Sequence, residues 1–485
     1  MQLRPYQIDA KNKIYSAFKK GVQNVMLQLP TGAGKTILFS SIIQDGHKLG
    51  RKILVLAHRA ELIDQAYKKL YYNYGIQAGI IKSGINADPL NPVQIASVQT
   101  MVNRKLFRPV DIVITDEAHH QQAGNTYGKI KDYVLFLNPN TKFLGVTATP
   151  CRTNGSGFRG VYDELIQGVS ITDLIKTNHL APPRYYVAPL KLENVKISAG
   201  DYNLKQLSEE YQNKVHAKDL VHNWLKLAKG LKTIGFAVDI DHSKSIVEAY
   251  KDKGIAAAHI DGTTNDYIRE RTIRDFQSGE ITVLYNVGVF DEGFDLPEIE
   301  AGQLARPTKS LIKFMQMVGR ALRPADGKRY AIVLDHAGLV AEHGIVEMER
   351  IWTLDGVEKK KKDKELMFKD RLTGKIYKPQ EIPFDIPMER IELIEYRYDP
   401  AYLEKAKLQK INKKFEQLRY ISHKRNLSAK WIWHKFIDGI KPDLDKAKTE
   451  KEVKIYADFY TEKMGFKPGY AHYLTKEFIS NNYSN

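Results

Sequence analysis

The chain has 485 residues, a formal net charge of +17, 43% hydrophobic residues and 27% charged residues. This length allows roughly three globular domains, and no apolar run reaches the roughly 18 residues that a membrane span requires. The single cysteine, Cys151, excludes a disulfide within the chain and a Cys-x-x-Cys zinc site. Together with an N-terminus that lacks the apolar core of a signal peptide, this predicts a reducing compartment: the bacterial cytoplasm or that of a phage-infected host.

A glycine loop near the N-terminus follows the apolar run 25–29 and precedes a helical pattern. It reads Pro30, Thr31, Gly32, Ala33, Gly34, Lys35 and Thr36. A strand, a glycine loop and a helix in this order bring backbone N–H groups onto phosphate oxygens at the positive end of the helix. We expect Lys35 to reach the β- and γ-phosphates and Thr36 to ligate Mg²⁺. Leu29 stands where the strict pattern has glycine, so an ordinary loop is the alternative interpretation.

Two adjacent carboxylates, Asp116 and Glu117, follow the apolar run 112–115. Side chains at the carboxyl end of a parallel strand face the crevice in which ligands bind. We expect Asp116 to hold the Mg²⁺ and Glu117 to polarise the attacking water. Adjacent acids are also common in turns, but together with Lys35 and Thr36 they predict a nucleoside-triphosphate hydrolase.

Apolar runs that read as strands alternate with helical patterns in two groups. The first group comprises 25–29, 53–57, 112–115 and 143–147, and the second comprises 233–238, 257–260, 282–285 and 330–334. Such alternation is typical of parallel sheets with helices on both faces. A polar, irregular stretch, 185–215, separates the groups, so we expect an α/β protein with two tandem domains.

Six further segments resemble, in chain order, the motifs of superfamily 2 helicases of the DEAH-box type. They are residues 3–7, 54–59, 95–100, 145–150, 286–295 and 316–324. The likeness covers about residues 1–340 and is similar in detail to RadD-like repair helicases and phage-encoded fork-remodelling helicases. Many RadD-like proteins carry a cysteine-rich zinc segment after the motor, which this chain lacks.

The resemblance implies that the two tandem domains of the α/β fold are RecA-like, and the helical and basic pattern that follows them predicts a mainly helical accessory domain. We expect boundaries at 1–184 for the ATP-binding domain, 185–215 for the linker, 216–348 for the second domain and 349–485 for a basic DNA-binding domain. Further ATP contacts are implied for Arg4, Gln7, Glu292, Gly293 and Asp295, with Gln7 reading the base. The resemblance also implies that His119, Thr147 and Thr149 couple the ATP state to domain movement. It implies that Arg59, Gln99 and Thr100 contact DNA.

The motif at 316–324 implies catalytic roles for Gln316, Arg320 and Arg323. Two arginines three residues apart share one face of a helix. A planar guanidinium stabilises charge that develops on the γ-phosphate, and an arginine of this kind raises the rate by roughly 10³–10⁵ in related reactions. The alternative is that both arginines cap a helix end before Pro324. Because Lys35 belongs to the first domain, we expect ATP to bind between the domains and to draw them together.

Beyond about residue 350 the motifs end and the chain becomes basic. Residues 401–436 contain ten Lys or Arg and two acids, interleaved with aromatic residues, and a helical stripe is formed by Leu408, Ile411, Phe415 and Leu418. Basic side chains bind phosphates and aromatic rings stack on bases, so we expect Lys424, Arg425 and Trp431 to contact DNA. An equally good interpretation is a basic helix whose aromatic residues form a core.

Other classes of protein remain open. Pro442 and Asp443, followed by Glu452 and Lys454, match the letters of a restriction-type nuclease, but residues 445–451 form a charged helical pattern without the apolar strand that such a site needs. The acid motif does not separate DNA from RNA helicases.

We expect a monomeric ATP-dependent DNA helicase or translocase that moves 3′→5′ by family likeness. It should act on single-stranded and branched DNA in replication, recombination or repair. A single-strand-binding or recombination protein is a candidate partner.

Overall fold

The computed structural model divides the chain into two compact units, residues 1–397 and 398–485. In the first unit it describes residues 2–85, 88, 90–104, 108–121, 126–153, 155–188, 190, 192, 195–198, 200–290, 299–357, 368–370, 376–377, 391–392 and 394–396. In the second it describes 411–412, 414–416, 418–419, 422, 427–437, 446–467 and 469–483. Within these ranges, every helix is too short or too polar to cross a membrane.

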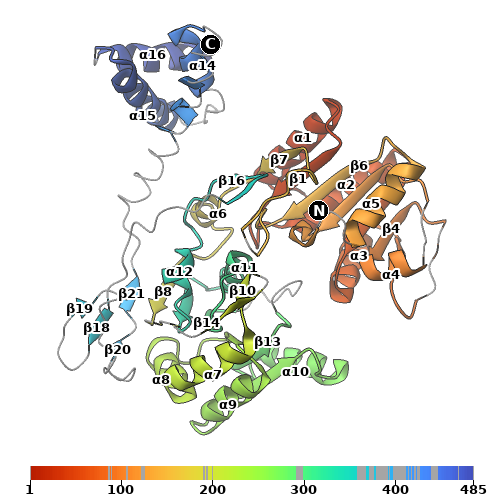
Figure 1. The fold of residues 1–485 in the computed structure, drawn as a ribbon, viewed down its shortest axis with the longest axis vertical. Coiled ribbons are helices and arrows are strands. Elements are labelled where there is room, and N and C mark those ends of the chain that lie inside the picture. Colours follow the sequence, from red (N-terminus) through yellow and green to blue (C-terminus); the bar gives the residue numbers. More distant parts are fainter. Residues whose placement is uncertain are drawn as a thin grey trace. The chain divides into compact units, whose positions relative to one another are not determined.

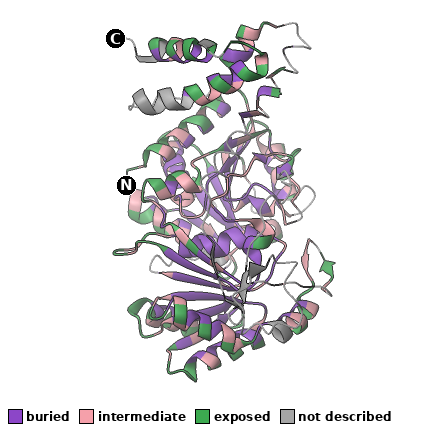
Figure 2. Ribbon diagram, turned by 90° about the vertical axis from the view of Figure 1, so that its left-hand side faces the viewer, coloured by how far each residue is buried: buried purple, intermediate pink, exposed green. Residues whose placement is uncertain are grey.

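The first domain is built on a seven-stranded parallel sheet in the order β3-β4-β2-β5-β6-β1-β7 (Figure 1). Its strands are β1 (Asn24–Gln28), β2 (Ile53–Ala57), β3 (Gly79–Ile81), β4 (Val93–Ser97), β5 (Ile112–Asp116), β6 (Lys142–Thr147) and β7 (Glu164–Gln167). Its helices are α1 (Pro5–Lys19), α2 (Lys35–Lys48), α3 (Ala60–Tyr74), α4 (Val98–Arg104) and α5 (Thr126–Leu137), with a 3₁₀ turn at Ala118–His120. Strands β1, β2, β4, β5 and β6 are buried apart from at most one terminal residue, which explains their continuous apolar character. Figure 2 shows buried residues on the strands and exposed residues mostly on the helices.

The second domain has a seven-stranded sheet in the order β12-β13-β11-β14-β15-β8-β21. Its strands are β8 (Pro183–Val187), β11 (Thr233–Ala237), β12 (Ala257–Asp261), β13 (Val283–Val287), β14 (Ala301–Ala305), β15 (Ala331–Asp335) and β21 (Ile394–Tyr396). All pairs are parallel except β21 with β8. The associated helices are α6 (Ile171–Lys176), α7 (Leu204–Lys214), α8 (Ala217–Leu227), α9 (Ile240–Lys251), α10 (Asp266–Ser278), α11 (Leu311–Ala321) and α12 (Leu339–His343).

These two sheets confirm the predicted α/β fold with tandem RecA-like domains. Each of the eight predicted strands is present, with ends that differ from the prediction by at most two residues. Within the stretch expected as a linker, the structure has the end of β8, two short strands within 197–202 and the helix α7. β8 pairs with β15 because Tyr185 and Val187 are buried in the second sheet. The domain boundaries themselves stay a prediction.

After the second sheet, the chain returns to the first domain as a short hairpin, β16 (Trp352–Thr353) and β17 (Gly356–Val357). The Leu354 carbonyl accepts hydrogen bonds from the N–H groups of Phe158, at 2.7 Å, and Arg159, at 2.8 Å. Gln167 Nε2 donates to the Trp352 carbonyl at 3.0 Å. We call residues 352–357 the return hairpin, since they join the end of the second domain to the first.

Shorter antiparallel strands complete the first unit. They are β9 (Ile197–Ser198) with β10 (Asp201–Tyr202), and β18 (Phe368–Asp370) with β19 (Ile376–Tyr377) and β20 (Ile391–Glu392).

The second unit is helical, with α14 (Ala429–Ile437), α15 (Lys446–Met464) and α16 (Gly469–Tyr483). Phe415, Trp433, Phe436 and Tyr460 form its core and are at most 3% exposed. This confirms a helical C-terminal region. A nuclease site would need Glu452 and Lys454 on a strand, but both positions lie in the helix α15. The other two residues of that alternative, Pro442 and Asp443, lie outside the described residues.

Candidate functional site

The glycine loop between β1 and α2 has the backbone of an anion-binding loop. Gly32 and Gly34 have φ angles of 84° and 75°, in the left-handed region that favours glycine. α2 begins immediately afterwards at Lys35, so the loop N–H groups and the helix dipole act at one place. Leu29, the departure from the strict pattern, extends β1: its N–H donates to the Thr147 carbonyl at 2.9 Å and its side chain is fully buried. A leucine here therefore belongs to the sheet and leaves the loop intact.

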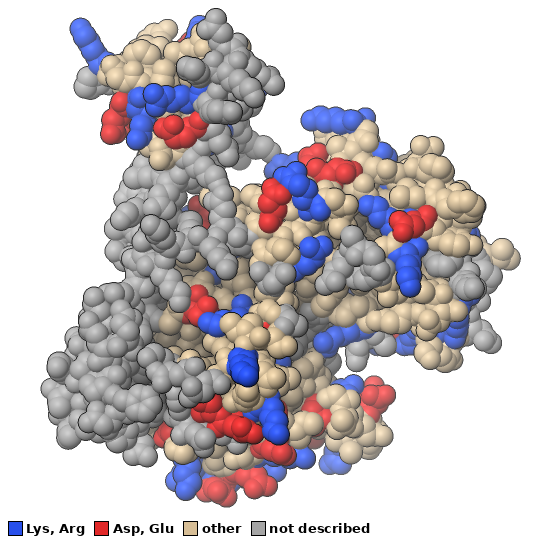
Figure 3. All heavy atoms as spheres, viewed as in Figure 1, with Lys and Arg blue, Asp and Glu red and all other residues tan. Residues whose placement is uncertain are grey.

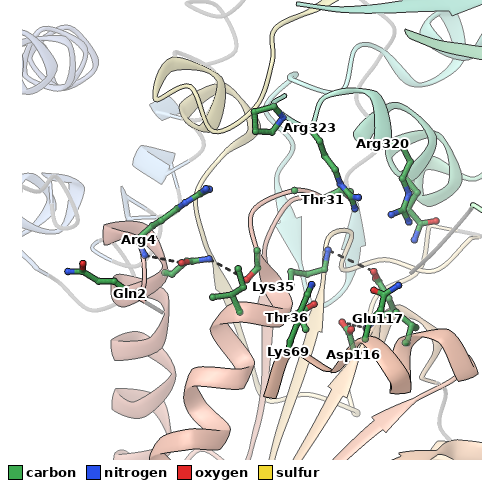
Figure 4. Close-up of a pocket in the computed structure, with 18 residues that line it drawn as sticks. Gln2, Arg4, Thr31, Lys35, Thr36, Lys69, Asp116, Glu117, Arg320 and Arg323 are labelled. Carbon is green, nitrogen blue, oxygen red and sulfur yellow. Dashed lines mark hydrogen bonds and ion pairs between the residues drawn. The ribbon is translucent and has the colours of Figure 1, made fainter. Parts of the chain in front are cut away.

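A cavity of about 310 Å³ opens at this loop and is lined from both RecA-like domains (Figure 4). The predicted residues of the first domain that line it are Arg4, Gln7, Thr31, Gly32, Gly34, Lys35, Thr36, Asp116 and Glu117. The second domain contributes Gln316, Arg320, Arg323 and Pro324. Figure 4 shows Arg320 and Arg323 extending from the second domain toward the loop. The structure thus brings together predicted residues that lie almost 300 positions apart in the chain.

The carboxylates at the end of β5 lie against Lys35. Lys35 Nζ is 3.9 Å from Glu117 Oε1, and the N–H of Glu117 donates to Asp116 Oδ1 at 3.0 Å. Burial, together with the neighbouring Glu117, raises the pKa of Asp116 to about 6. A divalent cation would offset both effects, so this donor set fits Mg²⁺. Glu117 has a φ of 46°, a backbone strain that often marks functional positions.

His119 connects this acid pair to the segment after β6. Its Nδ1 lies 3.3 Å from Glu117 Oε2 and 3.0 Å from Thr147 Oγ1. The N–H of Thr149 donates in turn to Thr147 Oγ1 at 3.2 Å. Because His119, Thr147 and Thr149 are at most 6% exposed, this path of contacts is shielded from water.

Gln7 is buried and contacts the glycine loop directly. Its Nε2 donates to the carbonyls of Ala33, at 3.1 Å, and Gly34, at 3.3 Å, while its Oε1 accepts from the N–H of Arg4 at 2.9 Å. In this conformation Gln7 therefore fixes the loop to the start of α1. Its predicted contact to an adenine base stays a prediction.

Gly319 has a place in the site that sequence analysis missed. It lies in α11 opposite the glycine loop, and a Cβ at this position would be 2.8 Å from Thr31 Cβ. Glycine therefore permits the second domain to approach the loop at van der Waals distance. The available signal was a glycine inside a helical pattern, which often marks close packing.

The predicted nucleic-acid residues are less closely grouped. Arg59 donates to the Gly288 carbonyl at 3.2 Å and so joins the two domains. Gln99 is exposed and accepts from Ser97 Oγ at 3.1 Å, and Thr100 follows it in α4. Trp431 is half-buried against the core of the second unit. Glu292, Gly293, Asp295, Lys424 and Arg425 lie outside the described residues.

Comparison with known proteins decides the family. Residues 1–152 match the family model "Type III restriction enzyme, res subunit", and residues 216–325 match "Helicase conserved C-terminal domain". The "51.5 kDa protein" of a Lactococcus phage (isolate 7-9) is 33% identical over 346 residues, covering 70% of this chain and 72% of that protein. The chain belongs to the superfamily 2 helicases.

One further relative agrees with this superfamily 2 assignment, and one solved structure shares the fold. "Putative ATP-dependent helicase IRC3" of Saccharomyces cerevisiae is 33% identical over 359 residues, covering 69% of this chain and 51% of that protein. The chain therefore spans about half the length of this yeast relative. A solved fragment, "a putative HsdR subunit of a type I restriction enzyme from Vibrio vulnificus YJ016", shares the fold, with a TM-score of 0.55, 21% identity and coverage of 71% of this chain and 67% of that one. This superfamily 2 helicase is an ATPase that binds nucleic acid.

Proposed function

We propose that this helicase moves along DNA by hydrolysing ATP in the cavity between its RecA-like domains. The observation that carries the proposal is that Lys35, Glu117 and Arg320 line one cavity although they come from two domains. A site divided in this way is complete only when the domains approach each other. Hydrolysis can therefore be converted into domain movement, which is what translocation requires.

Each polar side chain of the cavity has a proposed task. Lys35 and the N–H groups of the glycine loop hold the β- and γ-phosphates, and Thr36 and Asp116 hold Mg²⁺. When bound, Mg²⁺ neutralises charge on those phosphates. Glu117 orients and polarises the attacking water, and its carboxylate is the group that receives a proton from it.

The second domain supplies the remaining charge. Arg320 and Arg323 donate to the γ-phosphate oxygens as negative charge develops there, and Gln316 supports their placement from one turn before Arg320. The buried contacts from Glu117 through His119 to Thr147 offer a route by which a change at the carboxylate reaches the segment after β6. We propose that this route couples ATP state to domain movement.

DNA is the proposed track, with Arg59, Gln99 and Thr100 contacting the strand and movement in the 3′→5′ direction by family likeness. The start of the chain and the 316–324 motif resemble those of RadD-like DNA helicases, which supports DNA over RNA. An RNA helicase and the motor subunit of a restriction system are the alternatives. ATPase rates with single-stranded DNA, duplex DNA, forked DNA and RNA test this: strongest stimulation by RNA would contradict the proposal.

We further propose that the C-terminal basic domain holds a second arm of branched DNA, as in fork remodelling. A motor that follows one strand has its whole track within the RecA-like pair, whereas an enzyme that migrates junctions must also hold duplex arms. Phosphate contacts suffice for that purpose, and the ten-to-two excess of basic residues between 401 and 436, including Lys424 and Arg425, suits it.

The proposal also includes the domain organisation and the partners of the chain. The proposed domain boundaries are 1–184, 185–215, 216–348 and 349–485. We propose that the protein is a monomer and that its partner is a single-strand-binding or recombination protein.

The test removes residues 400–485 and compares the shortened and full chains on a four-way junction and on a tailed duplex. Affinity should be measured against salt concentration, because each lost phosphate contact lowers the salt dependence. We expect the truncated protein to lose junction affinity selectively while its single-strand-stimulated ATPase persists. Equal losses on both substrates would assign the domain a general or structural role and contradict the branched-DNA proposal.

A further inference from the structure

Three exposed aromatic residues lie in a row at the end of the C-terminal unit. Phe466 follows α15, and Tyr470 and Tyr473 lie on α16; they are 38%, 39% and 57% exposed. Ring centroids of Phe466 and Tyr470 are 4.8 Å apart, and those of Tyr470 and Tyr473 are 5.8 Å apart with an interplanar angle of 19°. We call these three residues the aromatic row.

The aromatic row is fixed to the core at one end and open at the other. The Phe466 ring lies 5.9 Å from that of Tyr460, which is 2% exposed. Among the described residues of this unit, the members of the row are the large hydrophobic side chains that are exposed. Scattered exposed aromatic residues need no explanation, but three rings in which each contacts the next form a surface suited to a ligand.

Charged side chains surround the row with a positive excess. Lys463, Lys467 and Lys476 are exposed, and Tyr470, Tyr473 and Lys476 follow at intervals of three residues, so they share one face of α16. The acids nearby are Glu462, which is exposed, and Glu477, which is half-buried; His472 is exposed. Lys467 adjoins Phe466 in the chain and Lys476 lies one turn beyond Tyr473, whereas Lys463 Nζ lies over the Phe459 ring, 5.7 Å from its centroid. Exposed rings with exposed lysines next to them along the chain match a ligand that has both flat apolar faces and negative charges.

We propose that the aromatic row binds an unpaired stretch of nucleic acid, with bases stacked on Tyr470 and Tyr473 and phosphates held by Lys467 and Lys476. Single-stranded nucleic acid is the ligand class that presents flat rings and phosphates together, and stacking is tolerant of base sequence. This inference rests on the proposed action on DNA and adds a second, strand-binding site outside the motor. It also assigns stacking to side chains other than Trp431, whose indole packs on the core.

The test uses the full-length chain and a labelled oligo(dT) of about 30 nucleotides, a length that exceeds the roughly 4–16 nucleotides of a typical single-strand site. We compare the wild type with the double variant Tyr470→Ala/Tyr473→Ala, using Tyr267→Ala as the control. Tyr267 is 67% exposed on α10, outside the row. Loss of two stacking rings should weaken binding by roughly tenfold or more, whereas the control should bind as the wild type does.

A second probe separates stacking from a structural effect. On an oligonucleotide of the same length made of abasic sites, the double variant and the wild type should bind equally, because no base is present to stack. Tyr473→Phe should retain binding to oligo(dT), since it preserves the ring. A variant defect that persists on the abasic strand, or in Tyr473→Phe, would overturn the inference.

Salt dependence tests the lysines separately. Lys467→Gln and Lys476→Gln should each reduce the slope of log affinity against log salt by about 0.7, whereas the tyrosine substitutions should leave it unchanged.

The outcomes separate this inference from the proposed function. Suppose that the wild type binds oligo(dT) and that DNA stimulates its ATPase. If the double variant then binds oligo(dT) as tightly as the wild type, the aromatic row does not bind nucleic acid, and the proposed function stands. If the substitutions change self-association or protein binding while oligonucleotide affinity is unaltered, the inference is likewise overturned. Failure of the wild type to respond to DNA would instead contradict the proposed function.

Discussion

Glu117 is held in a geometry that suits a group acting on water beside the phosphates. Its two oxygens face different partners, with Lys35 Nζ 3.9 Å from Oε1 and His119 Nδ1 3.3 Å from Oε2. The left-handed backbone at Glu117 directs the carboxylate into the cavity instead of along β5. The carboxylate of Glu117 can accept a proton from water, whereas the neutral amide of a glutamine side chain cannot.

Glu117→Gln should preserve ATP binding and lower turnover by about 10²–10⁴, the usual contribution of general base catalysis. The substitution keeps the size and the contact with His119 but removes the charge. Nucleotide binding and steady-state ATPase should be measured side by side, with Lys35→Ala as the comparison that also weakens binding. ATPase near the wild-type rate in Glu117→Gln would show that Asp116 and Glu117 have been assigned wrongly.

At the scale of residues, the sequence predicts the charged groups better than their supports. Lys35, Asp116 and Glu117 follow apolar strands, and the carboxyl ends of parallel strands meet at one edge, so their proximity could be inferred. The contact of Gln7 with the glycine loop could not, and Gly319 gave only the general signal of a glycine in a helical pattern, which does not name Thr31 as its neighbour. Both contacts depend on how a helix approaches a loop, which leaves no periodic signal in the chain.

At the scale of elements, the approach of α11 to the glycine loop determines whether the two halves of the site meet. α11 carries Gln316, Gly319 and Arg320 on its buried surface. Its N-terminus is capped by Ser310, whose side chain accepts from the N–H of Lys313. Asp201 adds a second support by accepting from Thr308 Oγ1 at 2.8 Å and from Lys313 Nζ at 2.9 Å.

Gly319→Ala should lower ATPase activity by tenfold or more, even though alanine favours helix by about 1 kcal/mol over glycine. The new Cβ would be 2.8 Å from Thr31 Cβ, so α11 must move away from the loop and carry Arg320 with it. Gly262→Ala, which adds a Cβ with no atom within 4 Å, is the matched control. A Gly319→Ala enzyme as active as this control would contradict the proposed closeness of the two domains.

The return hairpin makes a separate prediction about stability. A Cβ at Gly157 would overlap the carbonyl oxygen of Leu354 and the backbone of 355–356, where neither partner can rotate away. Gly157→Ala should therefore displace residues 352–357 and cost about 1–3 kcal/mol, as overpacking usually does. Thermal unfolding and limited proteolysis at 352–357 measure this, against Gly262→Ala. Unchanged melting and unchanged cleavage would show that the hairpin contributes no stability.

The elements also show where inference from sequence ends. The central strands were predicted because strands buried on both faces read as apolar runs. The strand β8 was not predicted, because it joins the second sheet by pairing with β15, 148 positions further along the chain (Pro183 pairs with Ala331). The return hairpin is hidden for the same reason: its contacts with 157–159 are long-range, and two-residue strands carry no recognisable pattern.

At the scale of the whole molecule, the net charge of +17 is not gathered in one patch on the face drawn in Figure 3. Basic and acidic side chains are interspersed among the described residues there. General attraction of a polyanion is therefore separate from the specific contacts proposed for Arg59 and for the C-terminal unit. Under the two proposals above, the first unit is the ATP-driven motor and the second unit carries an accessory nucleic-acid site.

The central claim is that ATP is hydrolysed only when the second domain completes the site, and Arg320→Ala tests it most directly. ATP affinity and the single-strand-stimulated ATPase rate should both be measured on this variant. We predict that turnover falls by about 10³ or more, whereas ATP binding weakens much less, because the guanidinium acts mainly on charge that develops in the transition state. Turnover within a few-fold of the wild type would contradict a site shared between the two domains.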